Sequence, residues 1–405
     1  MKRMVGAVIG GVYYAAHMLL KVRAGFPIFL AAFNMRAGLV LMAPLLPIIS
    51  KYFNLSHLEM SILLSIPIAC FAGSSVIMGV LGRRASSDRI ITLALVALAL
   101  GLTFRMFTGF YGLFIFTALV GISIAVMNYE IPVWVKLHAP ESSGLITGIY
   151  VTLMGVGAAT ATAISVPIAE SSPFAWRLAM APWVLLAAAA AIYWITQRRD
   201  IARESSSTLS PFWKSSAMRN PMAWALVLFF GLESMTFYGS ASWLPTILIT
   251  KDFTLAGAAA AIAFSGLLGS AVGLFFPHWI SKFTDQRLLL AGISALTGFS
   301  FFMMTLQDGP ILILWLCLSN IGISMAFPAC LLLCSIKTET PDMTRTISTM
   351  MQSLGYIISA TGPLYVGTFF DITQNWNVAL LAIVSLTFTQ LLVGLIVGKP
   401  TKISE

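Results

Sequence analysis

The sequence predicts an all-α membrane protein in which twelve transmembrane helices form two six-helix bundles related by pseudo-twofold symmetry. Three observations predict this fold. Of the 405 residues, 58% are hydrophobic and only 10% are charged, whereas soluble domains carry about 25% charged residues. Twelve apolar runs are each long enough to cross a bilayer, which takes about 20 residues. The first six runs and the last six share short sequences in the same order.

The apolar runs fall into two sets of six, separated by one long polar stretch. They lie near residues 26–48, 59–81, 90–109, 112–135, 143–168 and 176–196, and near 221–246, 256–278, 288–306, 310–333, 344–367 and 377–398. An even number of crossings places both ends of the chain on the same side of the membrane.

The chain therefore divides into five segments: a short extension over 1–25, an N-terminal bundle over 26–196, a linker over 197–219, a C-terminal bundle over 220–398 and a tail over 399–405. The linker is rich in Ser and charge, as loops are. The extension is too short to cross and carries basic residues at both ends, so we interpret it as an interfacial segment. The alternative is a start codon placed too far upstream.

The distribution of Lys and Arg predicts the orientation. Nineteen of the 24 fall at the amino end, the even-to-odd connections, the linker and the tail, and one, Arg36, lies inside a span. The opposite connections hold four: Lys51, Arg105, Arg177 and Lys251. Because basic residues accumulate in cytoplasmic loops, we expect both termini in the cytoplasm. The net charge of +9 is scattered rather than gathered on one face, which argues against nucleic-acid binding.

The two halves match at a nearly constant offset. The matching pairs are Pro47 with Pro245, Asp88 with Asp285, Pro140 with Pro341, and Pro167 with Pro363, at offsets of 198, 197, 201 and 196 residues. Parallel repeats of this kind are similar to those of the major facilitator transporters, whose halves rock around a site near the middle of the membrane. The resemblance implies the major facilitator fold.

Arg36 is the most informative residue of the first span. A charge at mid-bilayer costs about 3 kcal/mol on insertion scales, and such charges face a cavity or one another. The "LP" pairs that end the first and seventh spans align Arg36 with Ser234, next to Glu233. We therefore predict that Arg36 binds substrate and that Glu233 is its counterion or a proton carrier. The alternative is a buried structural ion pair.

Other polar side chains at this depth complete a predicted substrate site with Arg36: Asn34, Tyr238, Gln352, Tyr356 and Asn320. Gln352 and Tyr356 are spaced i, i+4 and so share one helix face. An amide, a phenol and a guanidinium around one cavity suit a small anion. For each neutral residue the alternative is a hydrogen bond between helices.

A second group of residues predicts gating. The stretch "GVLGRRASSDRIITL" resembles the major facilitator loop motif, and the resemblance implies gating roles for Gly79, Asp88 and Arg89. Asp285 and Arg287 occupy the matching loop of the second half, and Glu130 near the end of the fourth span reads as a further gate residue. The alternative is that these charges only fix topology. The small residues at 155–163 and 266–273 predict close helix packing.

The sequence favours a transporter over an enzyme. It contains no phosphate-binding loop, no dinucleotide fingerprint, no nucleophile elbow and no metal-ligand spacing. The four cysteines lie inside apolar runs and read as packing residues. We expect no cofactor and no metal.

Three stretches resemble the cyanate porter family within the major facilitators. They are "FNMRAGLVLMAPLLPII" (33–49), "LESMTFYGSASWLPTIL" (232–248) and "STMMQSLGYIISATGPLYVGTFFDITQNW" (348–376). The resemblance implies transport of cyanate, nitro-aromatic or other small organic compounds across a bacterial inner membrane. Glu233 departs from the uncharged polar residue of many members.

These observations predict a secondary active transporter that moves a small anionic or polar organic solute by alternating access. Its expected partners are that solute, protons and the lipid bilayer, and we expect a monomer. Two alternatives stay open: a proton-coupled exporter of small organic or nitro-aromatic compounds, and a transporter-like receptor that binds without transport.

Overall fold

The computed structural model describes residues 26, 28–81, 85–138, 143–171, 175–197 and 212–403. The predicted extension over 1–25, most of the predicted linker and the last two residues lie outside the described residues. Over the described part of the chain the fold is entirely helical apart from one isolated bridge between Thr338 and Ile403. This confirms the predicted all-α class.

The first half of the chain, as the structure describes it, runs from residue 28 to residue 197. Its elements are the helical stretch Ile28–Phe53, whose second part is α2 (Met42–Phe53), then α3 (His57–Leu81), α4 (Ser87–Phe107), α5 (Phe110–His138), α6 (Ser143–Ala169), the short α7 (Ala175–Leu178) and α8 (Ala181–Gln197).

The second half runs from residue 212 to residue 403. It begins with two short 3-10 helices, η2 (Phe212–Lys214) and η3 (Ser216–Arg219). The remaining elements are α9 (Pro221–Ile249), α10 (Leu255–Ile280), α11 (Arg287–Leu306), η4 (Gly309–Ile311), α12 (Leu312–Ile336), α13 (Pro341–Ala360), α14 (Gly362–Thr373) and α15 (Trp376–Val397).

Local sequence explains where several of these helices begin. The Asn220 side chain accepts hydrogen bonds from the backbone N–H groups of Met222 and Ala223, with Pro221 at the first helical position of α9. Thr340 caps α13 in the same way ahead of Pro341. Side-chain caps and an early proline satisfy or remove the free N–H groups of a first turn.

Ten helical stretches among the described residues are long and apolar enough to cross a membrane. The two other predicted spans correspond to α3, of which His57–Gly73 is the apolar part with described side chains, and to α13 with α14. The predicted eleventh span over 344–367 divides into α13 and α14 at Thr361, which itself keeps helical backbone angles (φ −79°, ψ −10°). The break costs little, since Pro363 has no N–H to satisfy and its carbonyl accepts a bond from Trp243 Nε1 (2.9 Å).

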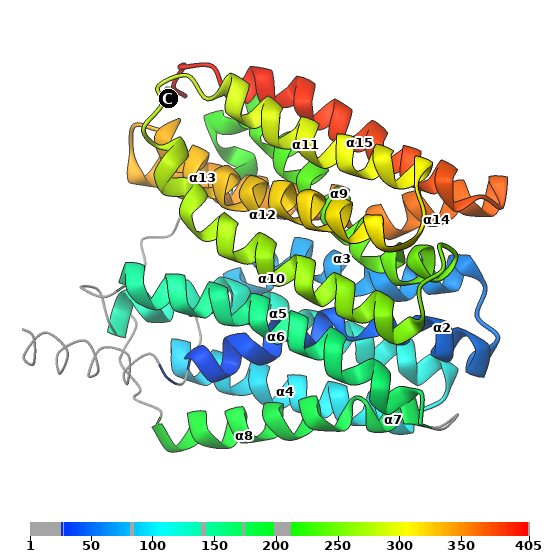
Figure 1. Ribbon diagram of the computed structural model, residues 1–405. Helices are drawn as coiled ribbons and strands as arrows, with labels where there is room; N and C mark the ends of the chain where they lie inside the picture. Colours follow the sequence, from blue (N-terminus) through cyan, green and yellow to red (C-terminus); the bar gives the residue numbers. More distant parts are fainter. Residues whose placement is uncertain are drawn as a thin grey trace, which may run out of the picture.

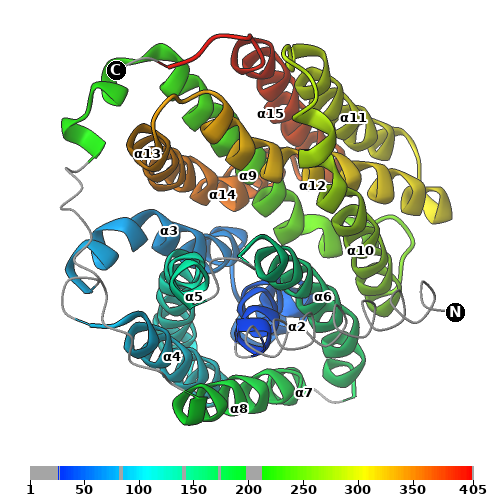
Figure 2. The same cartoon turned by 90° about the vertical axis from the view of Figure 1, so that its left-hand side faces the viewer.

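The helices of each half pack mainly on one another (Figures 1 and 2). In the first half α4 packs on α5 and α8, and α3 packs on α5. In the second half the main pairs are α10 with α12, α11 with α15, and α9 with α13. The halves meet through α6 with α10, α3 with α13 and α14, and α2 with α9.

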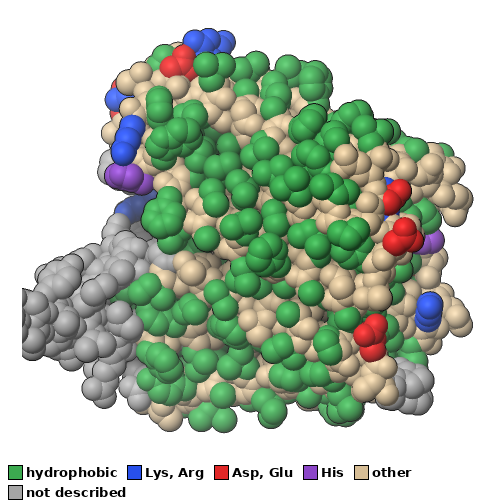
Figure 3. All heavy atoms as spheres, viewed as in Figure 1, with side chains coloured by type: hydrophobic (Ala, Val, Ile, Leu, Met, Phe, Trp, Pro, Cys, Tyr) green, Lys and Arg blue, Asp and Glu red, His purple; other side chains and the backbone are tan. Residues whose placement is uncertain are grey.

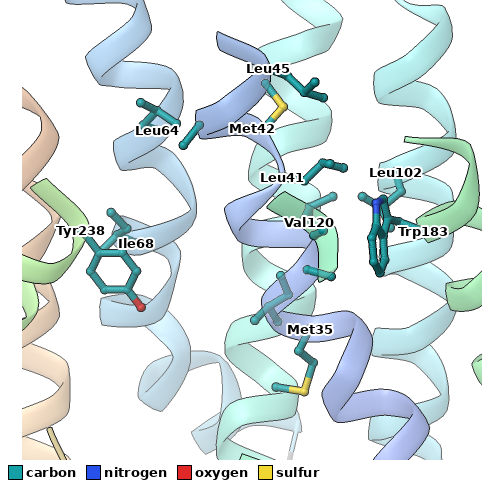
Figure 4. Packing of buried hydrophobic residues seen from close by; sticks show 14 of the residues in the cluster. Met35, Leu41, Met42, Leu45, Leu64, Ile68, Leu102, Val120, Trp183 and Tyr238 are labelled. Atoms are coloured by element: carbon teal, nitrogen blue, oxygen red, sulfur yellow. The ribbon is translucent and has the colours of Figure 1, made fainter. Parts of the chain in front are cut away.

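We call the end of the molecule that holds residues 398–403 the tail face, at the left of Figure 1, and the opposite end the far face. On the side shown in Figure 3, charged side chains lie at these two ends and hydrophobic side chains cover the middle. This is the surface that a bilayer requires. A largely apolar interior completes the fold, and Figure 4 shows part of it around the first crossing, between Trp183 and Tyr238.

Small residues allow close approach in the two stretches where the sequence predicts it. A Cβ built at Gly157 on α6 would lie 2.0 Å from the carbonyl oxygen of Phe33. On α10, a Cβ at Gly269 would lie 2.6 Å from the carbonyl oxygen of Asn320, and one at Gly273 would lie 2.4 Å from that of Ser324. Only glycine fits these contacts without moving a backbone.

The C-terminal residues fold back onto the loops of the second half. The backbone N–H of Gln286 donates to the carbonyl of Gly398 (3.0 Å), and that of Ile403 donates to the carbonyl of Lys337 (2.7 Å). The buried Lys337 ammonium donates to the carbonyl of Lys399 and to Gln286 Oε1. Burial lowers the pKa of Lys337, and the charge of Asp285 opposes that shift.

Candidate functional site

The Arg36 side chain lies between the two halves. Its guanidinium carbon sits 4.7 Å from the centre of the Phe237 ring on α9, a cation–π contact. The side chain is half-buried. Among the described residues, no carboxylate lies within the 4.0 Å of an ion pair with Arg36. The guanidinium therefore keeps its hydrogen-bond donors available on the side away from the ring.

Glu233 lies one helical turn before Phe237 on α9 and is almost completely buried, with 3% of its surface exposed. Its carboxylate accepts a hydrogen bond from the Ser234 hydroxyl (2.8 Å). Arg36 and Glu233 influence each other electrostatically without direct contact. The predicted neighbourhood of the two charges is present, but in this conformation they do not form a close pair.

A row of aromatic rings leads away from Arg36. The ring centres of Phe237 and Tyr238 are 4.9 Å apart, those of Tyr238 and Phe71 are 6.5 Å apart, and those of Phe71 and Tyr356 are 5.2 Å apart. Phe230 stands edge-on to Tyr356 at 5.2 Å. The charge of Arg36 acts on both tyrosines. The structure thus brings Arg36, Tyr238 and Tyr356 together, from the first crossing, α9 and α13.

A cavity adjoins the end of this row, between α3, α5 and α13. It is small, with a volume of about 50 Å³, and is partly open to solvent. Its lining comes from Phe71 on α3, from Ala125, Asn128 and Tyr129 on α5, and from Thr349, Gln352, Ser353 and Tyr356 on α13. Gln352 and Tyr356 are among the lining residues, and Arg36 is not.

Sequence reasoning missed Tyr129, Thr349 and Ser353, and did not place Asn128 at the substrate. The signal for two of them was available. Thr349 and Ser353 are spaced i, i+4, and both fall on the face of α13 that carries Gln352 and Tyr356. Asn128, Tyr129 and Gln352 are exposed although they belong to helices expected to cross the membrane, because the cavity reaches them.

Two predicted site residues lie elsewhere. Asn34 is fully buried and donates to the backbone carbonyl of Trp183 on α8 (3.3 Å). Asn320 on α12 donates to Ser265 Oγ on α10 (3.1 Å). Both amides make the contacts between helices that the sequence left as their alternative, and neither is brought to Arg36 in this conformation.

Two of the predicted gate residues of the first half, Asp88 and Glu130, are buried at the tail face. Asp88 accepts a hydrogen bond from Trp134 Nε1 (3.0 Å), and His138 Nε2 lies 3.4 Å from its other oxygen. Glu130 is fully buried and accepts a bond from the Ser87 hydroxyl (2.5 Å). This cluster ties the start of α4 to the end of α5.

The other predicted gate residues do not join this cluster. Arg89 is exposed at the start of α4, and Gly79 falls in the last turns of α3, where only the backbone is described. In the second half, Asp285 and Arg287 are exposed and bond through Nε and Nη2 of the arginine. These bonds lower the pKa of Asp285 to about 2, so this carboxylate keeps its charge at physiological pH.

One further pair joins the halves at the far face, and sequence reasoning did not find it. His57 Nδ1 at the start of α3 lies 3.1 Å from Asp371 Oδ1 on α14. The His57 ring also packs edge-on against Phe370, at 4.8 Å between centres. No sequence pattern marks this pair, because its members lie 314 residues apart at the ends of predicted spans.

No group of three His, Cys, Asp or Glu side chains in the described part of the chain is placed to hold a metal ion. The groups that the site offers to a solute are the Arg36 guanidinium, the row of rings and the polar cavity beside it.

Comparisons with known proteins identify the family and its transporters. The sequence model of the Major Facilitator Superfamily matches residues 28–363. The uncharacterized transporter YycB of Bacillus subtilis is 29% identical over 360 residues, which cover 88% of this chain and 89% of that protein. The 2-nitroimidazole transporter of Escherichia coli is 28% identical over 376 residues, covering 93% and 95%.

A third relative is the cyanate transport protein CynX of Escherichia coli, 27% identical over 351 residues that cover 86% of this chain and 90% of that protein. Among solved structures, the nucleoside transporter NupG matches with a TM-score of 0.75 at 14% identity, covering 93% of this chain and 98% of that one. At this identity the likeness shows the fold alone.

Proposed function

The chain belongs to the major facilitator superfamily, and from that premise we propose that it moves a small anionic or polar organic solute across a bacterial inner membrane, with Arg36 at the binding site. The relatives are transporters, and the resemblance to cyanate and 2-nitroimidazole transporters predicted from the sequence is confirmed. Beyond the family, the proposal states the charge of the solute, the residues that bind it and the orientation of the chain in the membrane.

The observation that carries the proposal is the unpaired Arg36. A guanidinium inside a membrane-spanning helix is costly to keep without a counterion. Here it has a ring on one side and no carboxylate within 4.0 Å among the described residues. A planar anion such as a carboxylate, cyanate or nitro group would supply the missing acceptors in bidentate geometry.

The arrangement of the halves supports alternating access. At the far face His57 and Asp371 join the halves, while the cavity between α5 and α13 lies nearer the tail face and exposes Gln352. Taking the basic tail face as cytoplasmic, this state faces inward. The bodies that would rock are residues 26–196 and 220–398.

Glu233 favours a second candidate, proton coupling. A carboxylate with 3% exposure and no close basic partner is well placed to take up and release a proton as the site opens to each side. A proton-coupled exporter of small organic compounds uses the same residues in the opposite direction.

The test is binding and counterflow with the purified full chain. We expect cyanate, 2-nitroimidazole or benzoate to raise the melting temperature, since a ligand that binds only the folded state stabilises it. Arg36→Lys should fold but lose most counterflow in proteoliposomes, and Arg36→Ala should lose binding. Unchanged binding by Arg36→Ala, measured calorimetrically, would overturn the anion site. Binding by the wild type without counterflow would identify a receptor instead.

A further inference from the structure

We propose that the preferred solute is an aromatic monoanion with a neutral hydrogen-bonding group at the end opposite its charge, held between Arg36 and the polar cavity of α5 and α13. This inference rests on the proposed function, because it takes Arg36 as the anion site. It adds a second subsite and a substrate class.

The polar groups of the cavity are the first support. Within the described part of the chain, the side chains of Asn128, Tyr129, Thr349 and Tyr356 make no hydrogen bond, and Gln352 uses only its amide nitrogen, toward Ser348 Oγ (3.1 Å). Polar groups at membrane depth ordinarily bond to neighbouring helices. Several unpaired ones around one cavity indicate that a ligand, or the water it displaces, is their partner.

The lining, as far as the structure describes it, also carries no charge. It consists of two amides, two phenols, two hydroxyls, one phenyl ring and one methyl group. An amide both donates and accepts, so Asn128 and Gln352 can bond to a hydroxyl, a carbonyl or a carboxamide. A second carboxylate placed here would be desolvated without a counterion, which is costly. The cavity therefore selects neutral polar groups.

The row of rings connects the two ends of the site. Phe71 and Tyr356 line the cavity, Tyr238 stands next to Phe71, and Phe237 beside Tyr238 carries the Arg36 guanidinium. Aromatic rings stack or meet edge to face at centre distances of about 4.5–7 Å. A planar ring of the solute can therefore replace a ring-to-ring contact of this row, with its anionic group toward Arg36 and its opposite substituent toward Gln352.

Three benzoates test the proposal by calorimetry on the full chain at pH 7: benzoate, 4-hydroxybenzoate and terephthalate. We expect 4-hydroxybenzoate to bind about tenfold tighter than benzoate, the gain of one good hydrogen bond, and terephthalate to bind more weakly than either. Gln352→Met should abolish the preference for the hydroxyl. The matched control is Gln374→Met, at an exposed glutamine near the far face, which should keep the preference.

The outcomes separate this inference from the proposed function. Equal affinity for benzoate and 4-hydroxybenzoate in the wild type, or an equal loss of both in Gln352→Met, overturns the second subsite. If cyanate binds in an Arg36-dependent manner while none of the benzoates binds, the anion site stands and the aromatic class is wrong. If benzoate binding survives Arg36→Ala, the proposed function itself fails.

Discussion

His57 Nδ1 and Asp371 Oδ1 lie 3.1 Å apart and join α3 of the first half to α14 of the second. The two helices also approach closely one turn further on, where a Cβ built at Gly367 would lie 2.4 Å from Ser61 Oγ. The pair and the close approach hold α3 and α14 together at the far face. A transporter that works by alternating access must separate them in every cycle.

Asp371→Asn should make the far face open more often. The pair is partly exposed, with 37% and 39% of the two side chains accessible, so it is worth at most about 1 kcal/mol and the change at most about fivefold. The measurement is the rate at which maleimide labels Ser61→Cys, corrected for labelling of the native cysteines. Ser61 has 2% exposure in this state, so its labelling reports opening. The matched control is Asp308→Asn, which breaks the pair of Lys251 and Asp308 within the second half.

Glu233→Gln should separate binding from coupling. Because Glu233 and Arg36 form no ion pair in this state but interact electrostatically, the substitution should keep exchange while altering the affinity for the solute. If Glu233 carries the proton, accumulation driven by a pH gradient should be lost. Exchange and uptake driven by a pH gradient are both measured in proteoliposomes for Glu233→Gln. The control variant is Glu170→Gln, at an exposed position. Full accumulation in Glu233→Gln would remove the proton-carrier role.

Gly273→Ala should destabilise the second half, because its Cβ would lie 2.4 Å from the Ser324 carbonyl oxygen. Forcing atoms into a packed contact costs about 1–3 kcal/mol, and the melting temperature should fall by a few degrees. Gly266→Ala on the same helix meets nothing within 4 Å and should leave the melting temperature unchanged. Equal behaviour of the two variants would show that α10 and α12 separate readily.

Lys337→Leu should loosen the tail. It removes the bonds of the ammonium group to Lys399 and Gln286 but keeps the backbone bond to Ile403. Losing a hydrogen bond from a charged donor costs about 1.5–3 kcal/mol, so trypsin should cut after Lys402 at least tenfold faster, as followed by mass spectrometry. Lys282→Leu, at an exposed lysine of the α10–α11 loop, should leave the rate unchanged.

Hydropathy and the internal repeat predict the fold, because every crossing must be long and apolar and the two halves reuse the same turns. They also mark Arg36 and Glu233, since a charge inside an apolar run is visible in the sequence. The rotation of each helix about its own axis is harder to predict from the sequence. Most spans are apolar on all sides, so nothing in the sequence shows that Asn34 turns toward Trp183 or Asn320 toward Ser265.

Contacts between the halves are beyond sequence reasoning for a different reason. The pairing of His57 with Asp371, or the placing of Asn128 opposite Gln352, depends on how two separately folded bundles meet. The break at Thr361 has a sequence signal, because Gly362 and Pro363 follow it, but the same signal is compatible with a kink inside one helix.

The attachment of residues 398–403 to Gln286 and Lys337 has a practical use. A fluorophore on the tail follows the second half as a whole, since the tail is bonded to two of its loops. A partner dye at Arg89→Cys, exposed at the start of α4, belongs to the first half. Energy transfer between the two dyes would change whenever the two halves of one molecule move relative to each other. Neither dye would lie near the solute.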